Sequence, residues 1–97
     1  MPFRIVLMPQ AIDDLRKFRA NVRSNVRSAI EIHLRYEPTR ISRNRIKRLR
    51  ELDHPQYRLR VGDIRVFYDV FDARVEVLAI VSKIEAAAWL AQFAEFP

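Results

Sequence analysis

The sequence predicts one small α+β domain, and three changes of hydrophobic pattern along the chain indicate this fold class. In the N-terminal third, apolar residues recur at helical spacing, which is typical of amphipathic helices. Between Gln56 and Phe71 they alternate with other residues, and from Val75 to Val81 nearly every residue is apolar. Alternation is typical of a strand with one buried face. A continuous apolar run is typical of a strand that is covered on both faces. We therefore expect helices packed against a sheet.

The N-terminal third predicts a strand followed by a helical hairpin. Phe3 to Met8 form a short apolar strand that is closed by Pro9, where the first helix begins. Its expected buried stripe is Ala11, Leu15 and Phe18. A second helix is expected from Asn21 to Tyr36, with a stripe of Val22, Val26, Ile30 and Leu34. The connection between the helices is so short that they must pack as a hairpin.

The remaining chain predicts three strands and a last helix. Residues 39 to 53 are basic and have no clear period, so we expect an irregular or partly helical segment. Gly62-Asp63 separates two alternating runs, with glycine first as a type II′ turn prefers. A helix is expected from Glu85 to Phe96. The expected order is β-α-α-β-β-β-α, an antiparallel-rich sheet in a single domain over residues 1–97.

Composition restricts the possible functions. The chain of 97 residues has no cysteine, which excludes disulfides, thiolate zinc sites and a cysteine nucleophile. Its two histidines, His33 and His54, are too far apart in sequence to suggest a metal site, so no metal or cofactor is expected. His33 is interpreted as a core residue and His54 as an ordinary loop residue. No run approaches the roughly 20 apolar residues that cross a bilayer, so we expect a cytoplasmic protein without a membrane partner.

The net charge of +6 is concentrated in the middle of the chain. Residues 40 to 65 contain nine basic and three acidic side chains, so this segment alone carries the whole excess. Clustered positive charge favours a polyanionic partner such as nucleic acid, a ribosome or an acidic protein, although a merely solvated basic face is the alternative. The candidate RNA-binding residues of the segment's first half are Arg43, Arg45, Lys47, Arg48 and Arg50.

The predicted hairpin places arginines together on one face of the sheet. A turn at Gly62-Asp63 sets Arg60 opposite Arg65 and Arg58 opposite Phe67. The other face would be the core, formed by Tyr57, Leu59, Val61, Ile64, Val66, Tyr68 and Val70. Directly opposed like charges destabilise a strand pair, which suggests that these arginines bind an anion. A phosphate on the guanidiniums and a base stacked on Phe67 would fit.

The alternative is that an internal carboxylate neutralises the arginines. Asp63, Asp69 and Glu76 are the candidates for that role. The aromatic residues of the last helix are expected to pack on the sheet or under a partner protein; they are Trp89, Phe93 and Phe96.

The segment from Ile46 to Tyr68 resembles the central signature of the RelE/ParE toxins of type II toxin–antitoxin systems. That family has a basic segment followed by Tyr-Arg-x-Arg-x-Gly-x-x-Arg-x-x-Tyr, which runs here from Tyr57 to Tyr68. Val77 to Leu90 is similar to the last strand and C-terminal helix of a RelE-like subgroup. The resemblance covers nearly the whole chain and implies a RelE-like fold.

The resemblance also implies an activity and partners. RelE-like members are ribosome-dependent mRNA endonucleases, which cut without metal by attack of the RNA 2′-hydroxyl on the adjacent phosphate. By resemblance the catalytic residues are Arg58, Arg60 and Arg65, which would bind the scissile phosphate and stabilise its transition state. Lys83 is a further RNA-binding candidate. The implied partners are mRNA on the ribosome, with 16S and 23S rRNA contacts, and a cognate antitoxin that forms a hetero-oligomer with the toxin.

Two departures from the family leave other functions open. Well-understood members place a further arginine after the last strand and a tyrosine or histidine near the C-terminus. Here the corresponding region has Lys83 and Glu85, then Trp89 with no tyrosine or histidine nearby. A general acid or base typically contributes about 10²–10⁴-fold to a rate, so efficient cleavage is not assured. The alternatives are a ParE-like inhibitor of DNA gyrase and a weakly active toxin that acts mainly as an antitoxin-bound co-repressor.

Overall fold

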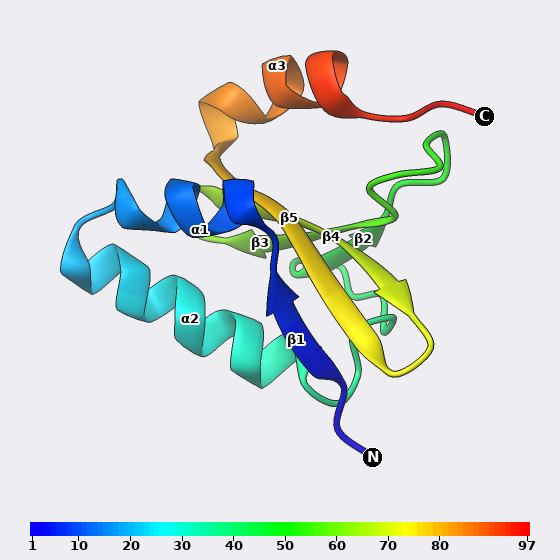
Figure 1. The fold of residues 1–97 in the computed structure, drawn as a ribbon, viewed down its shortest axis with the longest axis horizontal. Coiled ribbons are helices and arrows are strands. Elements are labelled where there is room, and N and C mark those ends of the chain that lie inside the picture. Colours follow the sequence, from blue (N-terminus) through cyan, green and yellow to red (C-terminus); the bar gives the residue numbers. More distant parts are fainter.

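The computed structural model describes residues 1–97 as three helices around a five-stranded sheet (Figure 1). The elements follow the order β1 (Arg4–Leu7), α1 (Pro9–Arg16), α2 (Ala20–Leu34), β2 (Ile46–Arg48), β3 (Tyr57–Val61), β4 (Ile64–Phe71), β5 (Arg74–Ser82) and α3 (Lys83–Phe93). Helices α1 and α2 form the predicted hairpin against one face of the sheet, and α3 packs on the other face. The predicted α+β class is confirmed.

The strand order across the sheet is β1-β5-β4-β3-β2. Only β1 runs parallel to its neighbour β5, and all other pairs are antiparallel. The register of β3 and β4 is the predicted one, with Arg60 opposite Arg65 and Arg58 opposite Phe67. Gly62 has φ +57° and Asp63 is not among the residues with positive φ, which agrees with a type II′ turn. The turn at Gly62-Asp63 therefore determines the register of β3 and β4, as the sequence predicted.

The core has two parts, one on each face of the sheet. The larger part joins α1 and α2 to the sheet and includes Leu59, Val66 and Tyr68, each fully buried. The stripe of α2 packs there as predicted, with Val22 only partly buried. The smaller part lies under α3 and consists of Phe67, Ala79, Val81 and Trp89. Because α3 buries only Trp89 in full, this helix is held by a small contact.

Three elements differ from the sequence-based expectation. Part of the segment expected to be irregular or helical forms β2, which pairs with β3 and extends the sheet by one strand. Its pairing depends on a distant strand, so local spacing could not reveal it. The helix α2 ends at Leu34 and not at Tyr36. The helix α3 spans Lys83–Phe93 and not Glu85 to Phe96; it begins where the Ser82 hydroxyl accepts a hydrogen bond from the Glu85 N–H. None of the helices is long and apolar enough to cross a bilayer.

Candidate nucleic-acid interface

Four basic side chains lie in two rows across neighbouring strands on the α3 side of the sheet. In the first row Arg60 is opposite Arg65. In the second row Lys47 is opposite Arg58, which is opposite Phe67. Adjacent strands are about 4.8 Å apart and the rows about 7 Å apart. We call these four residues the basic rows: Lys47, Arg58, Arg60 and Arg65. Arg45 precedes β2 and its carbonyl accepts the Arg60 N–H at 2.8 Å, but it also lines a hollow with His33 of α2, whose pKa is lowered by burial and then by the charge of Arg45.

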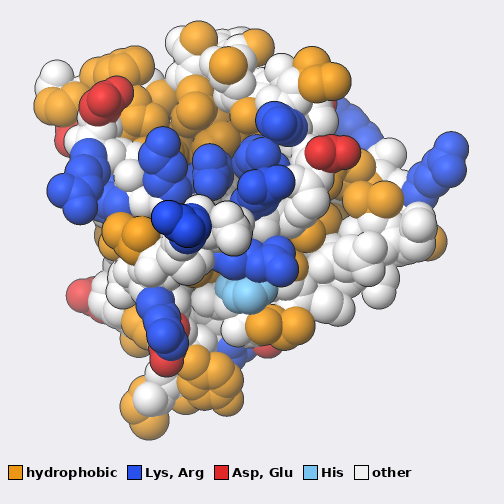
Figure 2. Space-filling view, turned by 180° about the vertical axis from the view of Figure 1, so that it is seen from behind, with side chains coloured by type: hydrophobic (Ala, Val, Ile, Leu, Met, Phe, Trp, Pro, Cys, Tyr) orange, Lys and Arg blue, Asp and Glu red, His pale blue; other side chains and the backbone are white.

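No carboxylate neutralises the basic rows. The five ion pairs of the molecule all lie elsewhere: Arg16–Asp13, Arg35–Glu31, Arg40–Glu37, Arg74–Glu76 and His54–Asp69. Two of the three carboxylates that could have neutralised the arginines, Asp69 and Glu76, therefore have other partners, and Asp63 forms no ion pair. Figure 2, which views the molecule from behind, shows lysine and arginine side chains gathered with few acidic ones between them. The charges of Lys47 and Arg60, the two exposed members of the basic rows, are therefore available to an external anion.

Arg58 is the most perturbed member of the basic rows. Burial, then the charges of Arg65 and Arg60, lower the pKa of its guanidinium. Its Nε atom is buried and has no hydrogen-bond acceptor. A buried donor without an acceptor costs about 1–3 kcal/mol, so the ligand-free site is unfavourable to this cation. An anion beside Arg58 would relieve both the like-charge repulsion and the missing hydrogen bond.

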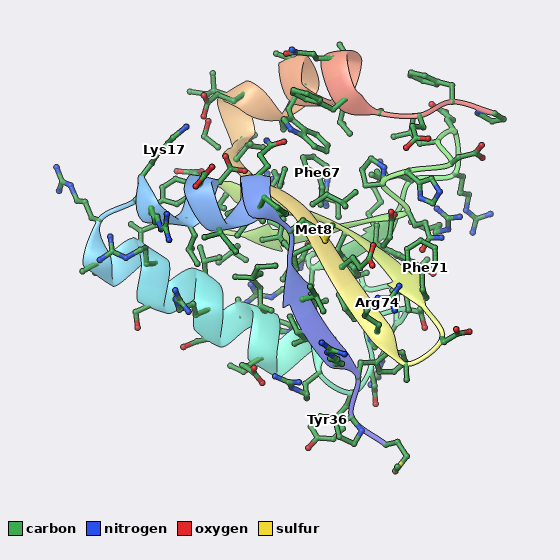
Figure 3. The ribbon with its side chains drawn as sticks, in the orientation of Figure 1. Met8, Lys17, Tyr36, Phe67, Phe71 and Arg74 are labelled. Atoms are coloured by element: carbon green, nitrogen blue, oxygen red, sulfur yellow. The ribbon has the colours of Figure 1, made fainter.

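Two residues predicted to be exposed at this interface are buried instead. Phe67, which lies beneath α3 in Figure 3, is 1% exposed. Its ring stacks on that of Trp89, with ring centroids 5.1 Å apart and an interplanar angle of 8°. Its ring therefore packs against α3 and is not open to a base. Arg65 is 7% exposed, and its Nη1 donates to the carbonyl oxygens of Gly62 at 2.8 Å and Ile64 at 3.1 Å. The Arg65 side chain therefore stabilises the β3–β4 turn. The Arg60 side chain, in contrast, is exposed to solvent.

The other predicted RNA-binding residues divide between several surfaces. Arg43 and Arg45 line a hollow of about 810 Å³ next to Arg60, at the turn end of the basic rows, and no hydrophobic residue contributes to its lining. Lys83 starts α3 beside the same turn, because its N–H donates to the Asp63 carbonyl at 2.6 Å. Arg48 lies over the ring of Tyr57, its partner in register, which belongs to the opposite face from Lys47.

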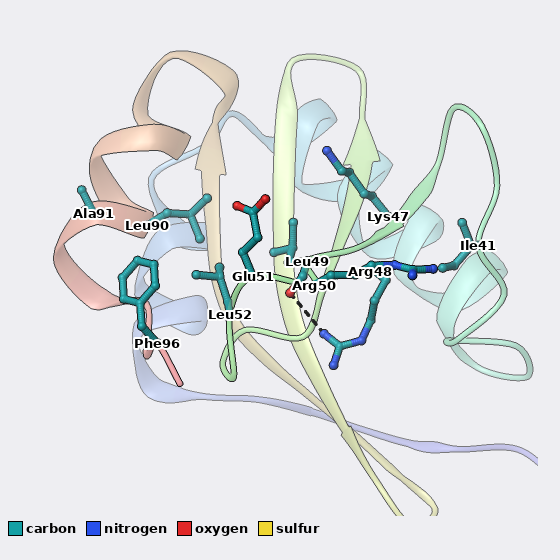
Figure 4. A pocket seen from close by; sticks show the side chains of 10 residues that line it. All are labelled: Ile41, Lys47, Arg48, Leu49, Arg50, Glu51, Leu52, Leu90, Ala91 and Phe96. Atoms are coloured by element: carbon teal, nitrogen blue, oxygen red, sulfur yellow. Dashed lines mark hydrogen bonds between the residues drawn. The ribbon is translucent and has the colours of Figure 1, made fainter.

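A second, partly apolar pocket of about 560 Å³ lies between the β2–β3 connection and the C-terminal end of α3 (Figure 4). Leu49, Leu52, Leu90 and Phe96 are among its apolar lining, and its charged lining consists of Lys47, Arg48, Arg50 and one acid, Glu51. Arg48 donates to the Leu49 carbonyl at 3.3 Å within this pocket. The combination suits a ligand with an apolar group and an acidic group.

No pattern in the sequence indicates the pair that His54 forms with Asp69. Asp69 is 4% exposed, and its carboxylate accepts hydrogen bonds from His54 Nδ1 at 2.8 Å and the Gln56 N–H at 2.7 Å. Burial raises the pKa of Asp69 more than these bonds lower it. The loop histidine is therefore structural: its backbone also pairs with Glu95, which ties the C-terminal segment to the loop. Nowhere do three histidine or acidic side chains gather as metal ligands would.

Comparison with solved structures agrees with this architecture. Escherichia coli toxin RelE, an arginine-to-alanine double mutant in the free state, has a TM-score of 0.69 and 25% identity, covering 95% of this chain and 94% of that one. The chain has the RelE toxin fold. The RelBE2 toxin–antitoxin complex of Mycobacterium tuberculosis gives a TM-score of 0.70 at 24% identity, with 84% and 99% of the two chains covered. The RelB–RelE complex of Methanococcus jannaschii gives 0.66 at 17%, with 87% and 96% covered.

Two other comparisons give nothing further. No protein-family model matches this RelE-like chain, and no curated protein matches its sequence. The similarity to RelE toxins is therefore seen in the three-dimensional fold. It agrees with the RelE-like signature between Tyr57 and Tyr68.

Proposed function

We propose that this RelE-like protein is the toxin of a RelBE-type toxin–antitoxin system and that it cleaves mRNA on the ribosome. The observation that carries the proposal is the pair of basic rows: four cations on neighbouring strands, none of which is paired with a carboxylate. Uncompensated arginines on adjacent strands suit a phosphodiester, because a guanidinium presents several N–H donors in one plane.

In the proposed reaction, the RNA 2′-hydroxyl oxygen forms a bond to the adjacent phosphorus while the bond from phosphorus to the 5′-oxygen breaks. The products are a 2′,3′-cyclic phosphate and a 5′-hydroxyl. Arg58 and Arg60 bind the non-bridging oxygens and stabilise their added negative charge, and Arg65 holds the turn that carries Arg60. The basic rows contain no histidine or tyrosine, so water accepts the 2′-hydroxyl proton. Arg58 stays protonated, as arginine does in proteins, so it donates hydrogen bonds to the phosphate while water supplies the proton that the leaving 5′-oxygen takes up.

The proposed protein partner is a cognate antitoxin, because two of the similar structures are RelE–RelB complexes and one is a RelBE2 complex. An acidic amphipathic segment fits the partly apolar pocket beside α3, with apolar side chains against Leu90 and Phe96 and carboxylates toward Lys47 and Arg50. In that position the segment would lie next to the basic rows and block RNA.

The test is induced expression in cells with and without the neighbouring antitoxin gene, followed by mapping of mRNA ends on purified ribosomes. Cuts phased with codons are expected for the unmodified protein and should be lost in Arg60→Gln, whose side chain is exposed and not needed for folding. Arg40→Gln is the matched control, because Arg40 is exposed and already paired with Glu37 at 2.8 Å.

Other outcomes would overturn the nuclease. Toxicity with intact message and gyrase-linked DNA breaks would identify a gyrase inhibitor. Absence of toxicity, together with antitoxin-dependent repression of the operon, would identify a co-repressor. Both results would leave the RelE-like fold and the basic rows without a catalytic role.

A further inference from the structure

Two buried hydrogen-bond donors of this molecule have no acceptor, and both flank the same aromatic ring. They are Arg58 Nε and Trp89 Nε1. Arg58 is directly opposite Phe67 in the sheet, and the indole of Trp89 stacks on Phe67 from the α3 side. Native proteins leave few buried donors unpaired, so each unpaired donor needs an explanation, such as a bound ligand.

We propose that Trp89 Nε1–H and Arg58 Nε–H form an oxyanion subsite that binds a phosphate of the RNA backbone. This inference rests on the proposed function, since it assigns Trp89 to the same RNA-binding surface. The single tryptophan of the chain is then a substrate-binding residue as well as the anchor of α3.

The cations beside Arg58 favour a phosphate chain over a protein carboxylate, whereas the other neighbours of Trp89 are apolar and include Ala79, Ala86 and Leu90. The basic rows continue from Arg58 to Arg60 and then to the hollow beside Arg43, which has no hydrophobic lining. A protein partner would bury apolar surface there, whereas a phosphate chain needs repeated cationic and polar contacts. Like-charge repulsion at Arg58 is also relieved by each added anion.

The position of α3 explains how the donors become accessible. Both donor atoms are covered in the ligand-free chain, so the phosphate must displace α3 side chains to reach them. Trp89 is the only buried residue of α3, and Ile84 and Phe93 on the same helix are 92% and 49% exposed. Such thin packing allows a small outward shift of the helix without unfolding the sheet.

The experiment measures binding of a fluorescein-labelled 2′-O-methyl RNA hexanucleotide, which cannot undergo 2′-hydroxyl attack, together with tryptophan emission of the protein. Binding is expected to change the emission of Trp89, which is the only tryptophan. Trp89→Phe keeps an aromatic ring on Phe67 but removes the N–H, and should weaken binding about 10-fold, as for one hydrogen bond to a charged group. Tyr36→Phe, an exposed aromatic on the far side, should bind as the unmodified protein does.

Salt dependence separates the two donors. Trp89→Phe removes no charge, so the slope of log affinity against log salt should stay unchanged while affinity falls at every salt concentration. Arg58→Gln should reduce that slope by about 0.7, the value for one single-strand phosphate contact. Urea unfolding of each variant checks that the sheet remains folded.

The outcomes are distinguishable from those of the proposed function. Binding by the unmodified protein with no change in emission and no loss in Trp89→Phe would overturn the subsite while the RNA-binding surface survives. No binding of the oligonucleotide by any form would count against both. A change in emission produced by a hexaglutamate peptide but not by the RNA would assign the donors to a protein carboxylate and overturn the phosphate.

Discussion

The opposed arginines of the hairpin should make the protein less stable than it could be, and Arg60→Gln tests this. Arg60 is exposed and lies directly opposite Arg65, and its charge adds to burial and to Arg65 in lowering the pKa of Arg58. Glutamine keeps much of the aliphatic stem but removes the charge. We expect the variant to be more stable than the unmodified protein and to lose RNA binding.

The expected gain is small but measurable. A directly opposed pair contributes about 0.2–1 kcal/mol, and because Arg60 is exposed we expect about 0.5 kcal/mol at low salt. For a domain of this size that corresponds to an increase in Tm of about 2–4 °C. At 1 M salt the screening length falls to about 3 Å, so most of the gain should vanish.

The assay is thermal and urea unfolding in low and high salt, with Arg74→Gln as the control. Arg74 is also a strand arginine but pairs with Glu76 at 2.9 Å, so its loss should lower stability at low salt. A destabilised Arg60→Gln, or a gain that is the same at both salt concentrations, would refute the claim that Arg60 and Arg65 repel each other in the free protein.

Three further predictions follow from single contacts. Gly62→Ala should lower the free energy of unfolding by about 1–2 kcal/mol, because φ is +57° there while a Cβ would meet no atom within 4 Å, and urea unfolding measures it; a neutral result would show that the turn relaxes. Asp69→Asn should cost about 1–3 kcal/mol at pH 7. Burial raises the pKa of Asp69 in the folded protein above its ordinary value of 3.8. The free energy of unfolding of the unmodified protein should therefore fall as the pH rises from 3.8 through the raised pKa, and urea titrations should show no such fall in the variant. Trp89→Ala should release α3 only, so hydrogen exchange should accelerate in α3 while β4 and β5 stay protected; equal acceleration everywhere would show that α3 is part of the main core.

The sequence by itself determined the hairpin and the larger part of the core. The register of β3 and β4 depends on local features, a period of two and a Gly62-Asp63 turn, so it could be worked out without knowing the rest of the fold. The same holds for the stripes of α1 and α2, since helical spacing alone identifies a buried face. The positions of the basic residues in the sequence also predicted the positive charge of the basic rows.

Only the tertiary structure decided which of these residues reach solvent. A strand pattern shows that Arg65 and Phe67 share a face, but that face is covered when α3 folds back over it, and this docking depends on Trp89 far along the chain. The pairing of β2 and the bond between His54 and Asp69 likewise join residues that only folding brings together. Sequence patterns report the direction of a side chain relative to its own backbone, whereas burial depends on what packs against it.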